Sequence, residues 1–151
     1  MNILKVQQDV LKALCKGERV LYYHTDTGDV FLSTKGTHGW IVPEELLQLK
    51  LIGAQQITDL GFEDLFREEN KLNGTDEYRN GGTARRYKPA RSPESSVYVD
   101  TNLLKYFDAP TLYQGEYEKG PIAVVEQPFD GEPLVVGMVL PVTIKDDDWK
   151  N

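Results

Sequence analysis

The chain of 151 residues contains a single cysteine, Cys15. One cysteine cannot form a disulfide within its own chain, so a disulfide-stapled fold is excluded. Cys15 lies in a segment with the pattern of an amphipathic helix. A small buried hydrophobe is therefore a better interpretation of this residue than a catalytic thiol.

Long hydrophobic runs are also missing. The longest, from Leu134 to Val142, is interrupted by Gly137 and Pro141, and it is far shorter than the roughly 20 residues that span a bilayer. The first residues lack the basic stretch, the apolar region and the small-residue cleavage site of a secretory signal. We therefore expect a cytoplasmic protein that makes no membrane contact.

Positive charge is the scarcer sign, with 17 Lys and Arg against 24 Asp and Glu, which gives a formal net charge of −7. Such a field repels phosphates and disfavours non-specific binding to nucleic acid or to anionic membranes. The hydrophobic fraction of 40% is typical of globular proteins with a packed core. The length fits one domain, or two small subdomains that share a core.

The first third of the chain predicts a helix followed by strands. Apolar residues at helical spacing cover Ile3 to Leu14, and Gly17 ends that segment. Two β-rich runs, 20–25 and 30–33, flank a short Asp/Gly turn and predict a hairpin. A third run, Trp40–Pro43, ends in proline.

The middle and the last third differ from each other. Residues Asn70–Pro93 are polar and rich in Asn-Gly and Pro, which predicts a loop or linker. Ordered structure is predicted again from Val97, with a short helix capped by Asp100 or Thr101. Strands are expected near Leu112, at Ile122–Glu126 and from Leu134.

The two ends of the chain read alike when placed side by side. Val6–Leu14 matches Val99–Phe107, and Trp40–Pro43 matches Met138–Pro141. Chance similarity between two helix-and-hairpin segments and duplication of one unit both account for the pattern. Duplication has a physical rationale, because each half has one helix too few to cover its own sheet and would bury that sheet against the other half.

We therefore predict an α+β fold of two repeated halves, each a helix with an antiparallel sheet. The predicted parts are 1–57, the first half; 58–94, a helical turn and a basic polar loop; 95–145, the second half; and 146–151, an acidic tail.

The order helix, strand, strand, strand with an apolar-apolar-Pro ending resembles one module of the DNA sliding clamp family. The resemblance covers about residues 6–43 and 97–144, and rests on element order and strand endings. It implies two modules per chain, a closed ring built from several chains, helices that line a channel and strands outside. The basic residues available on those helices are Lys5, Lys12, Lys16 and Lys105.

One stretch of this acidic chain is locally basic. Guanidinium groups pair with phosphates and aromatic rings stack on bases, so a loop of this composition is suited to single-stranded nucleic acid. The alternative is a solvated loop whose arginines pair with the acidic surface, and the flanking Glu77 and Glu94 favour it. The candidate nucleic-acid-binding residues are Arg79, Arg85, Arg86, Tyr87, Lys88 and Arg91.

Two histidines and two aspartates gather around the first predicted hairpin: His24, Asp26, Asp29 and His38. A metal site would need three or four such ligands to converge. Aspartates beside glycine are also ordinary turn residues, and turn chemistry is the better interpretation. The sequence contains no nucleophile elbow, phosphate-binding glycine loop or metalloprotease helix, so we expect no metal, cofactor or catalytic residue.

Three functional hypotheses remain. The leading one is a non-enzymatic, clamp-like interaction module in DNA replication or mobile-element maintenance, which contacts DNA or a replication protein and forms a homo-oligomer. The main alternative is an accessory α+β domain without a nucleic-acid role, which recognises a protein partner through residues 70–93. The weakest is a small hydrolase that uses the histidine-containing hairpin.

Overall fold

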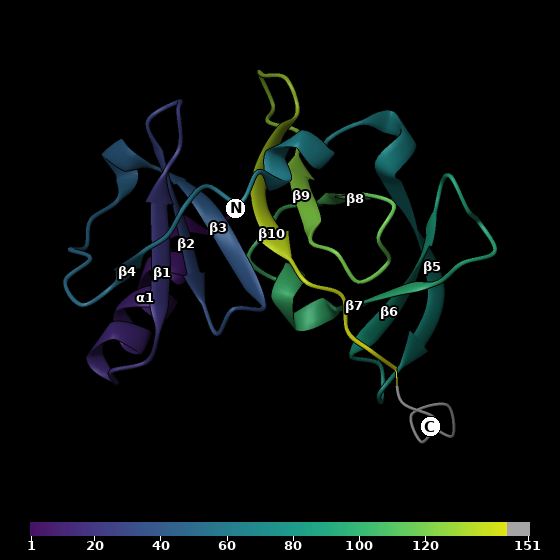
Figure 1. The fold of residues 1–151 in the computed structure, drawn as a ribbon, viewed down its shortest axis with the longest axis horizontal. Helices are drawn as coiled ribbons and strands as arrows, with labels where there is room; N and C mark the ends of the chain where they lie inside the picture. Colours follow the sequence, from purple (N-terminus) through teal and green to yellow (C-terminus); the bar gives the residue numbers. More distant parts are fainter. Residues whose placement is uncertain (145–151) are drawn as a thin grey trace.

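A computed structural model describes residues 1–144, and the predicted tail 146–151, with Trp149, lies outside them. The described chain is α+β, with one α-helix and a single ten-stranded mixed sheet (Figure 1). No helix within residues 1–144 combines the length and apolarity needed to cross a membrane. The helix is α1 (Ile3–Cys15), and the strands are β1 (Val20–His24), β2 (Asp29–Thr34), β3 (His38–Pro43), β4 (Gln55–Gln56), β5 (Lys71–Arg79), β6 (Ala84–Pro89), β7 (Val97–Asp100), β8 (Thr111–Gln114), β9 (Ile122–Glu126) and β10 (Leu134–Val139).

The predicted first helix is confirmed as α1. The Asn2 side chain caps it by accepting a hydrogen bond from the Lys5 backbone N–H at 3.0 Å. Val6, Val10 and Ala13 recur at helical spacing and are buried, so one stripe of the helix packs on the sheet. The chain leaves the helix through Gly17, whose positive φ of 70° suits glycine.

The strands β1, β2 and β3 form an antiparallel meander with both faces covered. Leu32 and Trp40 pair across β2 and β3 and belong to the core cluster beneath α1. Phe31 and Tyr23 point to the other face, where Phe62 of the short 3-10 helix η2 (Phe62–Leu65) covers them. Burial on both faces is consistent with the consecutive apolar residues Val30, Phe31 and Leu32 of β2.

The strands β8, β9 and β10 form a second antiparallel meander, and the two meanders join through their last strands. Gly137 of β10 pairs with Trp40 of β3, which makes the sheet continuous in the order β4-β1-β2-β3-β10-β9-β8-β5-β6-β7. Beyond β10, the Val142 N–H donates to the Tyr98 carbonyl of β7 at 2.9 Å. This contact closes β5 to β10 into a barrel-like unit.

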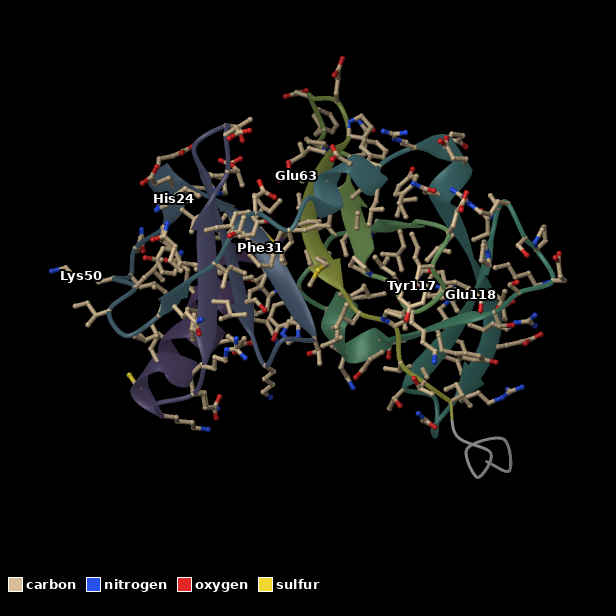
Figure 2. The ribbon with its side chains drawn as sticks, viewed as in Figure 1. His24, Phe31, Lys50, Glu63, Tyr117 and Glu118 are labelled. Carbon is tan, nitrogen blue, oxygen red and sulfur yellow. The ribbon has the colours of Figure 1, made fainter. Side chains whose placement is uncertain are left out.

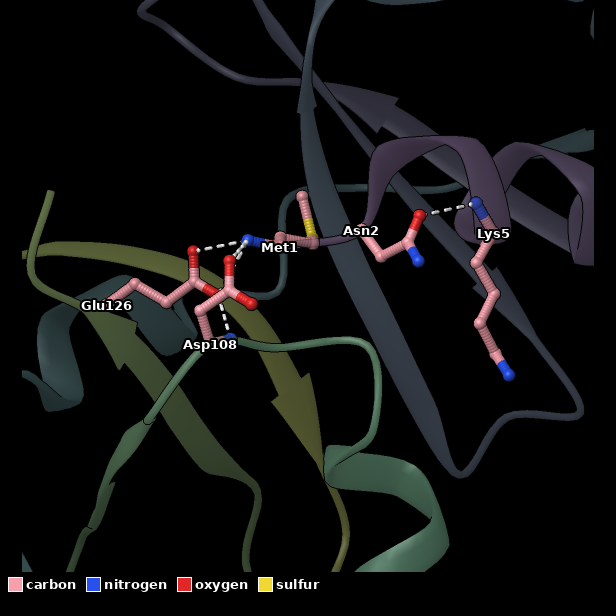
Figure 3. Close-up of polar contacts among 5 residues, drawn as sticks. All are labelled: Met1, Asn2, Lys5, Asp108 and Glu126. Atoms are coloured by element: carbon pink, nitrogen blue, oxygen red, sulfur yellow. Dashed lines mark hydrogen bonds and ion pairs between the residues drawn. The ribbon is translucent and has the colours of Figure 1, made fainter.

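The start of the chain ties the two parts together (Figure 3). The Met1 ammonium forms ion pairs with Asp108 at 2.8 Å and with Glu126 at 2.9 Å. The Asn2 backbone N–H donates to the Tyr106 carbonyl at 2.7 Å. The N-terminus of α1 is therefore anchored to the segment that leads into β8.

The second helix, predicted to follow Asp100, is shorter than predicted. The chain makes only the 3-10 helix η4 (Thr101–Leu104), capped by Asp100. Ala109 adopts a positive φ of 41° and Pro110 follows it, so the backbone turns away before a longer helix can form. Since the second half is a closed barrel-like unit with a single helical turn here, the structure does not confirm two repeated halves.

The loop predicted at Asn70–Pro93 is also wrong, because most of it is the β5–β6 hairpin. Asn80, Gly81 and Gly82 all adopt positive φ and make the turn between the strands. The buried residues of the hairpin are few, namely Leu72, Ala84 and Tyr87. Its many polar side chains hide the strand pattern, while the backbone pairs with β7 and β8.

Candidate functional site

The residues predicted to bind nucleic acid do not share one surface. Directly paired residues of neighbouring strands point their side chains to the same face of a sheet. Arg85 pairs with Val99 and Tyr87 pairs with Val97, and both valines are buried in the core. Arg86 and Lys88 therefore point to the opposite face from Arg85 and Tyr87.

Arg85 and Tyr87 are occupied by packing. The Tyr87 ring is only 6% exposed and belongs to the core, so its faces are not available for base stacking. The Arg85 guanidinium lies over that ring at 5.2 Å, and its Nε donates to the Thr75 carbonyl at 2.8 Å. It also fills the space beside Gly74, where any Cβ would lie 2.6 Å from it.

The outward cations gather around one carboxylate. Arg86 forms an ion pair with Glu77 at 2.6 Å, and its Nε donates to the Ser96 hydroxyl. The hydrogen bond from Arg86, with smaller effects of Arg79 and Lys88, lowers the pKa of the Glu77 carboxyl. Arg79, Arg86 and Lys88 therefore lie near the Glu77 carboxylate.

Arg91 lies apart from this group. Its guanidinium contacts Glu116 at 3.0 Å, the Glu69 carbonyl and the Asn70 side chain. These partners hold the end of the hairpin beside β8, which is a structural role. Of the six predicted residues, the structure thus brings Arg79, Arg86 and Lys88 together and separates Arg85, Tyr87 and Arg91 from them.

The four residues of the first hairpin are also separated. His24 lies exposed at the end of β1 (Figure 2), whereas His38 is 6% exposed at the start of β3. Asp29 takes part in the turn, where its backbone N–H donates to the Thr25 hydroxyl. Within residues 1–144, no three His, Cys, Asp or Glu side chains converge as metal ligands.

A cleft of about 490 Å³ opens between α1, the β2–β3 turn and the η4 region. Its volume is within the usual range for a small-molecule site. Residues of both meander-containing parts form its walls, so it lies at the seam of the molecule. Six of the lining residues are Asp9, Lys12, Lys35, His38, Asp100 and Tyr106.

An aromatic and polar network forms one wall of the cleft. The His38 ring contacts the Trp40 ring edge-on at 4.9 Å and stacks beside the Tyr106 ring at 6.1 Å. The Tyr106 hydroxyl donates a short hydrogen bond to the Asp9 carboxylate. Burial, helped by the nearby charge of Lys35, lowers the pKa of His38, so the ring is neutral at physiological pH.

Three lysines and Asp9 lie along one side of α1, between its buried stripe and its outermost side chains, which include Leu4 and Leu11. Lys5, Lys12 and Lys16 lie within about 40° of one another on a helix of 3.6 residues per turn, and all three are exposed. The one carboxylate of α1, Asp9, accepts the Tyr106 hydroxyl. We call these three residues the lysine stripe.

Negative charge collects at the other end of the molecule. Glu63 lies at the upper end in Figure 2, whereas α1 lies at the lower end in Figure 1. Burial and then the nearby charges of Asp59 and Asp29 raise the pKa of the Glu63 carboxyl. Several carboxylates, including Asp29, Asp59 and Glu63, therefore lie near one another at this end.

The sequence predictions missed the cleft as a site. They recorded His38 as a turn residue, and placed Tyr106 in a short helix. Asp9 and Tyr106 are 97 residues apart, and no local pattern links them. The spacing of Lys5, Lys12 and Lys16 was the one available signal.

No protein-family model, no curated protein and no solved structure matches this chain. The resemblance to sliding clamps therefore stays a prediction.

Proposed function

We propose that this protein is a non-enzymatic interaction module of two related, clamp-like halves, and that its helix-bearing face contacts nucleic acid. The lysine stripe carries the proposal. It is a row of three exposed lysines along one side of α1, with Asp9 half-buried among them, in a chain with a net charge of −7. Phosphate contacts made by lysine supply the sequence-independent part of nucleic-acid affinity.

The join between β3 and β10 does not superpose the two aligned segments. Trp40 pairs with Gly137, and Gly39 pairs with Met138. Trp40 packs in the cluster beneath α1, whereas its aligned residue Met138 packs in the cluster on the other face of the sheet. A two-fold rotation between antiparallel strands keeps the face to which a side chain points, so the proposed relation between the halves rests on the sequence match alone.

A ring of several chains could close if a strand of one chain paired with the edge strand of another, but little of the sheet edge is free for such pairing. The outer edge of β1 is paired with β4 at Leu21 and Tyr22. At the other end of the sheet, Val142 pairs with Tyr98 of β7. The proposal is therefore contact with nucleic acid from one side, and light scattering with and without DNA tests the predicted homo-oligomer.

The test is fluorescence anisotropy of labelled single-stranded and duplex DNA at increasing salt. We expect binding at low salt that weakens as salt rises. The double variant Lys5→Gln/Lys12→Gln should reduce the slope of log affinity against log salt by about one for each lysine removed. The matched control, Lys50→Gln/Lys119→Gln, removes the same charge from exposed positions off α1.

Absence of binding at low salt would contradict the proposal. Equal losses of affinity in the lysine-stripe variant and in the control would show that binding depends on net charge and not on the position of the lysines. A loss of affinity only in the Arg86→Gln/Lys88→Gln variant would show that the β5–β6 hairpin, and not α1, contacts the nucleic acid.

The second candidate is recognition of a protein partner by the hairpin, and one observation favours it. Glu77 and Glu116 neutralise Arg86 and Arg91, whereas the Tyr78 side chain is 44% exposed on β5. Exposed tyrosine is enriched at protein interfaces. This candidate predicts that pull-downs recover the same protein partner after nuclease treatment. The Tyr78→Ala variant should no longer recover it.

A further inference from the structure

A groove of about 520 Å³ lies between β7 and the residues that follow β10, apart from the cleft beside α1 (Figure 1). Val97 and Tyr98 of β7, both buried, line one side of it. The other side is formed by half-buried apolar side chains, namely Leu140, Pro141, Val142 and Ile144. The groove therefore offers apolar surface on two sides.

The backbone holds the apolar wall of the groove in place. The Val142 N–H donates to the Tyr98 carbonyl at 2.9 Å, and the Leu140 N–H donates to the Thr37 carbonyl at 2.8 Å. These bonds fix the wall to β7 and to the β2–β3 turn. The groove is therefore a preformed feature of the fold, as binding sites usually are.

Charge at the groove is balanced. Its charged lining residues are one glutamate and one lysine, Glu118 and Lys119, and both are exposed. At its margin, the Ser96 hydroxyl accepts a hydrogen bond from Arg86, whose guanidinium is paired with Glu77. Balanced charge around apolar walls favours a large apolar side chain over a strongly charged ligand.

The sequence places such a side chain close to the groove. Residues 145–151 continue directly from Ile144, and Trp149 is the only apolar residue among them. Trp149 follows Ile144 by five residues, which span at most about 18 Å. A segment tethered this closely has a high effective concentration, so a contact that is weak between separate molecules becomes well populated.

We propose that the groove binds residues 145–151 of the same chain, with the Trp149 ring between β7 and the apolar wall. The ring packs against Pro141 and Val142, while the three preceding aspartates stay in water. Burial of a large aromatic ring then adds to the stability of the barrel-like unit. The contact does not depend on the proposed nucleic-acid contact, since no residue of the lysine stripe lines the groove.

Acrylamide quenching of the tryptophan emission tests this contact in the full chain. The chain has two tryptophans and Trp40 is fully buried, so quenching of the folded protein reports on Trp149. We expect the quenchable share of the emission to be small. Ile144→Ser, which removes an apolar side chain from the wall, should raise this share towards the contribution of one tryptophan. Ile52→Ser is the matched control, since Ile52 is exposed and lies outside the groove lining.

NMR of the ¹⁵N-labelled protein locates the contact. Trp149→Ala removes the ring current of the indole and should shift the amide signals of groove residues, including Tyr98, Lys119 and Val142. Lys150→Ala alters the adjacent residue and should leave these signals in place. Backbone spectra also establish that Ile144→Ser is folded. If it is not folded, the effect of Trp149→Ala decides alone.

Readily quenched Trp149 emission in the unsubstituted chain would overturn the proposal, as would equal quenching in Ile144→Ser and Ile52→Ser. Shifts outside the groove on Trp149→Ala would place the ring elsewhere and also overturn it. Shielding that is lost on dilution would show that the groove binds this segment of a second copy, which contradicts a contact within one chain.

Discussion

His38 is a polar ring that the fold surrounds with aromatic groups on one side and a polar cleft on the other. It contacts Trp40 of its own strand, β3, and Tyr106 of the segment that follows η4. Burial and the charge of Lys35 both make protonation of this ring less favourable in the folded state. The ring therefore links the stability of the whole chain to pH.

We expect His38 to make the protein less stable in mild acid. The pKa of His38 in the folded state lies below its ordinary value of 6.5, so the unfolded chain binds the proton more readily. Stability is therefore full above pH 6.5 and falls as the pH drops towards the folded-state pKa. Urea unfolding over this range should show the fall, and His38→Gln should flatten it.

His24→Gln is the matched control for this measurement, because His24 is exposed. An equal flattening in both variants would show that the pH dependence does not arise from burial of His38.

Two glycines are also constrained at the residue scale. A Cβ on Gly39 would overlap the Phe31 ring and approach the Leu32 carbonyl oxygen to 2.9 Å. We expect Gly39→Ala to lower the free energy of unfolding by about 1–3 kcal/mol, the usual effect of overpacking. Gly131→Ala is the control, since its nearest neighbour, Pro128, would lie at an ordinary 3.6 Å. Similar stabilities in both variants would show that Phe31 moves aside at no energetic penalty.

At the scale of the elements, the β5–β6 hairpin separates structural from exposed charges. Tyr87 is in the core, whereas Arg86 points to the opposite face, where its side chain is 19% exposed and pairs with Glu77. We expect Tyr87→Ala to destabilise the protein by about 3–5 kcal/mol, as for other large buried rings. Arg86→Ala should cost about 1 kcal/mol or less, because exposed ion pairs contribute little. Chemical denaturation measures both, and a stable Tyr87→Ala variant would contradict the core assignment.

The same elements show what the sequence could predict. The helix α1 and the strands of both meanders follow from periodicity and from turn residues at their ends. The hairpin was missed because β5 and β6 carry few apolar residues and Gly74 interrupts the pattern. The cleft could not be predicted, since Asp9 and Tyr106 meet only after β3 and β10 pair.

At the scale of the whole molecule, the Met1 ammonium connects α1 to the segment before β8 and to β9. Burial alone would lower its pKa, but hydrogen bonds and charge from Asp108 and Glu126 outweigh this effect and raise the pKa above 8.0. The stabilisation is full below pH 8.0 and is lost as the pH rises through the folded-state pKa.

We therefore expect stability to decline as the pH rises above 8 and this ammonium loses its proton. Glu126→Gln/Asp108→Asn should be less stable at neutral pH and show a smaller decline. Thermal unfolding at several pH values measures this, with Glu132→Gln/Asp130→Asn as a control of equal charge. If the decline in stability is unchanged in the Glu126→Gln/Asp108→Asn variant, groups other than the Met1 ammonium cause it.

The pairing of β10 with both β3 and β9 also has a consequence for how the chain is made. The first meander can form early during synthesis, but its last strand, β3, then exposes an unpaired row of backbone groups. That row is covered only after Leu134–Val139 has left the ribosome, and open strand edges recruit other chains. A truncated or stalled chain that ends before β10 should therefore aggregate, even though its first half already contains a helix and three strands.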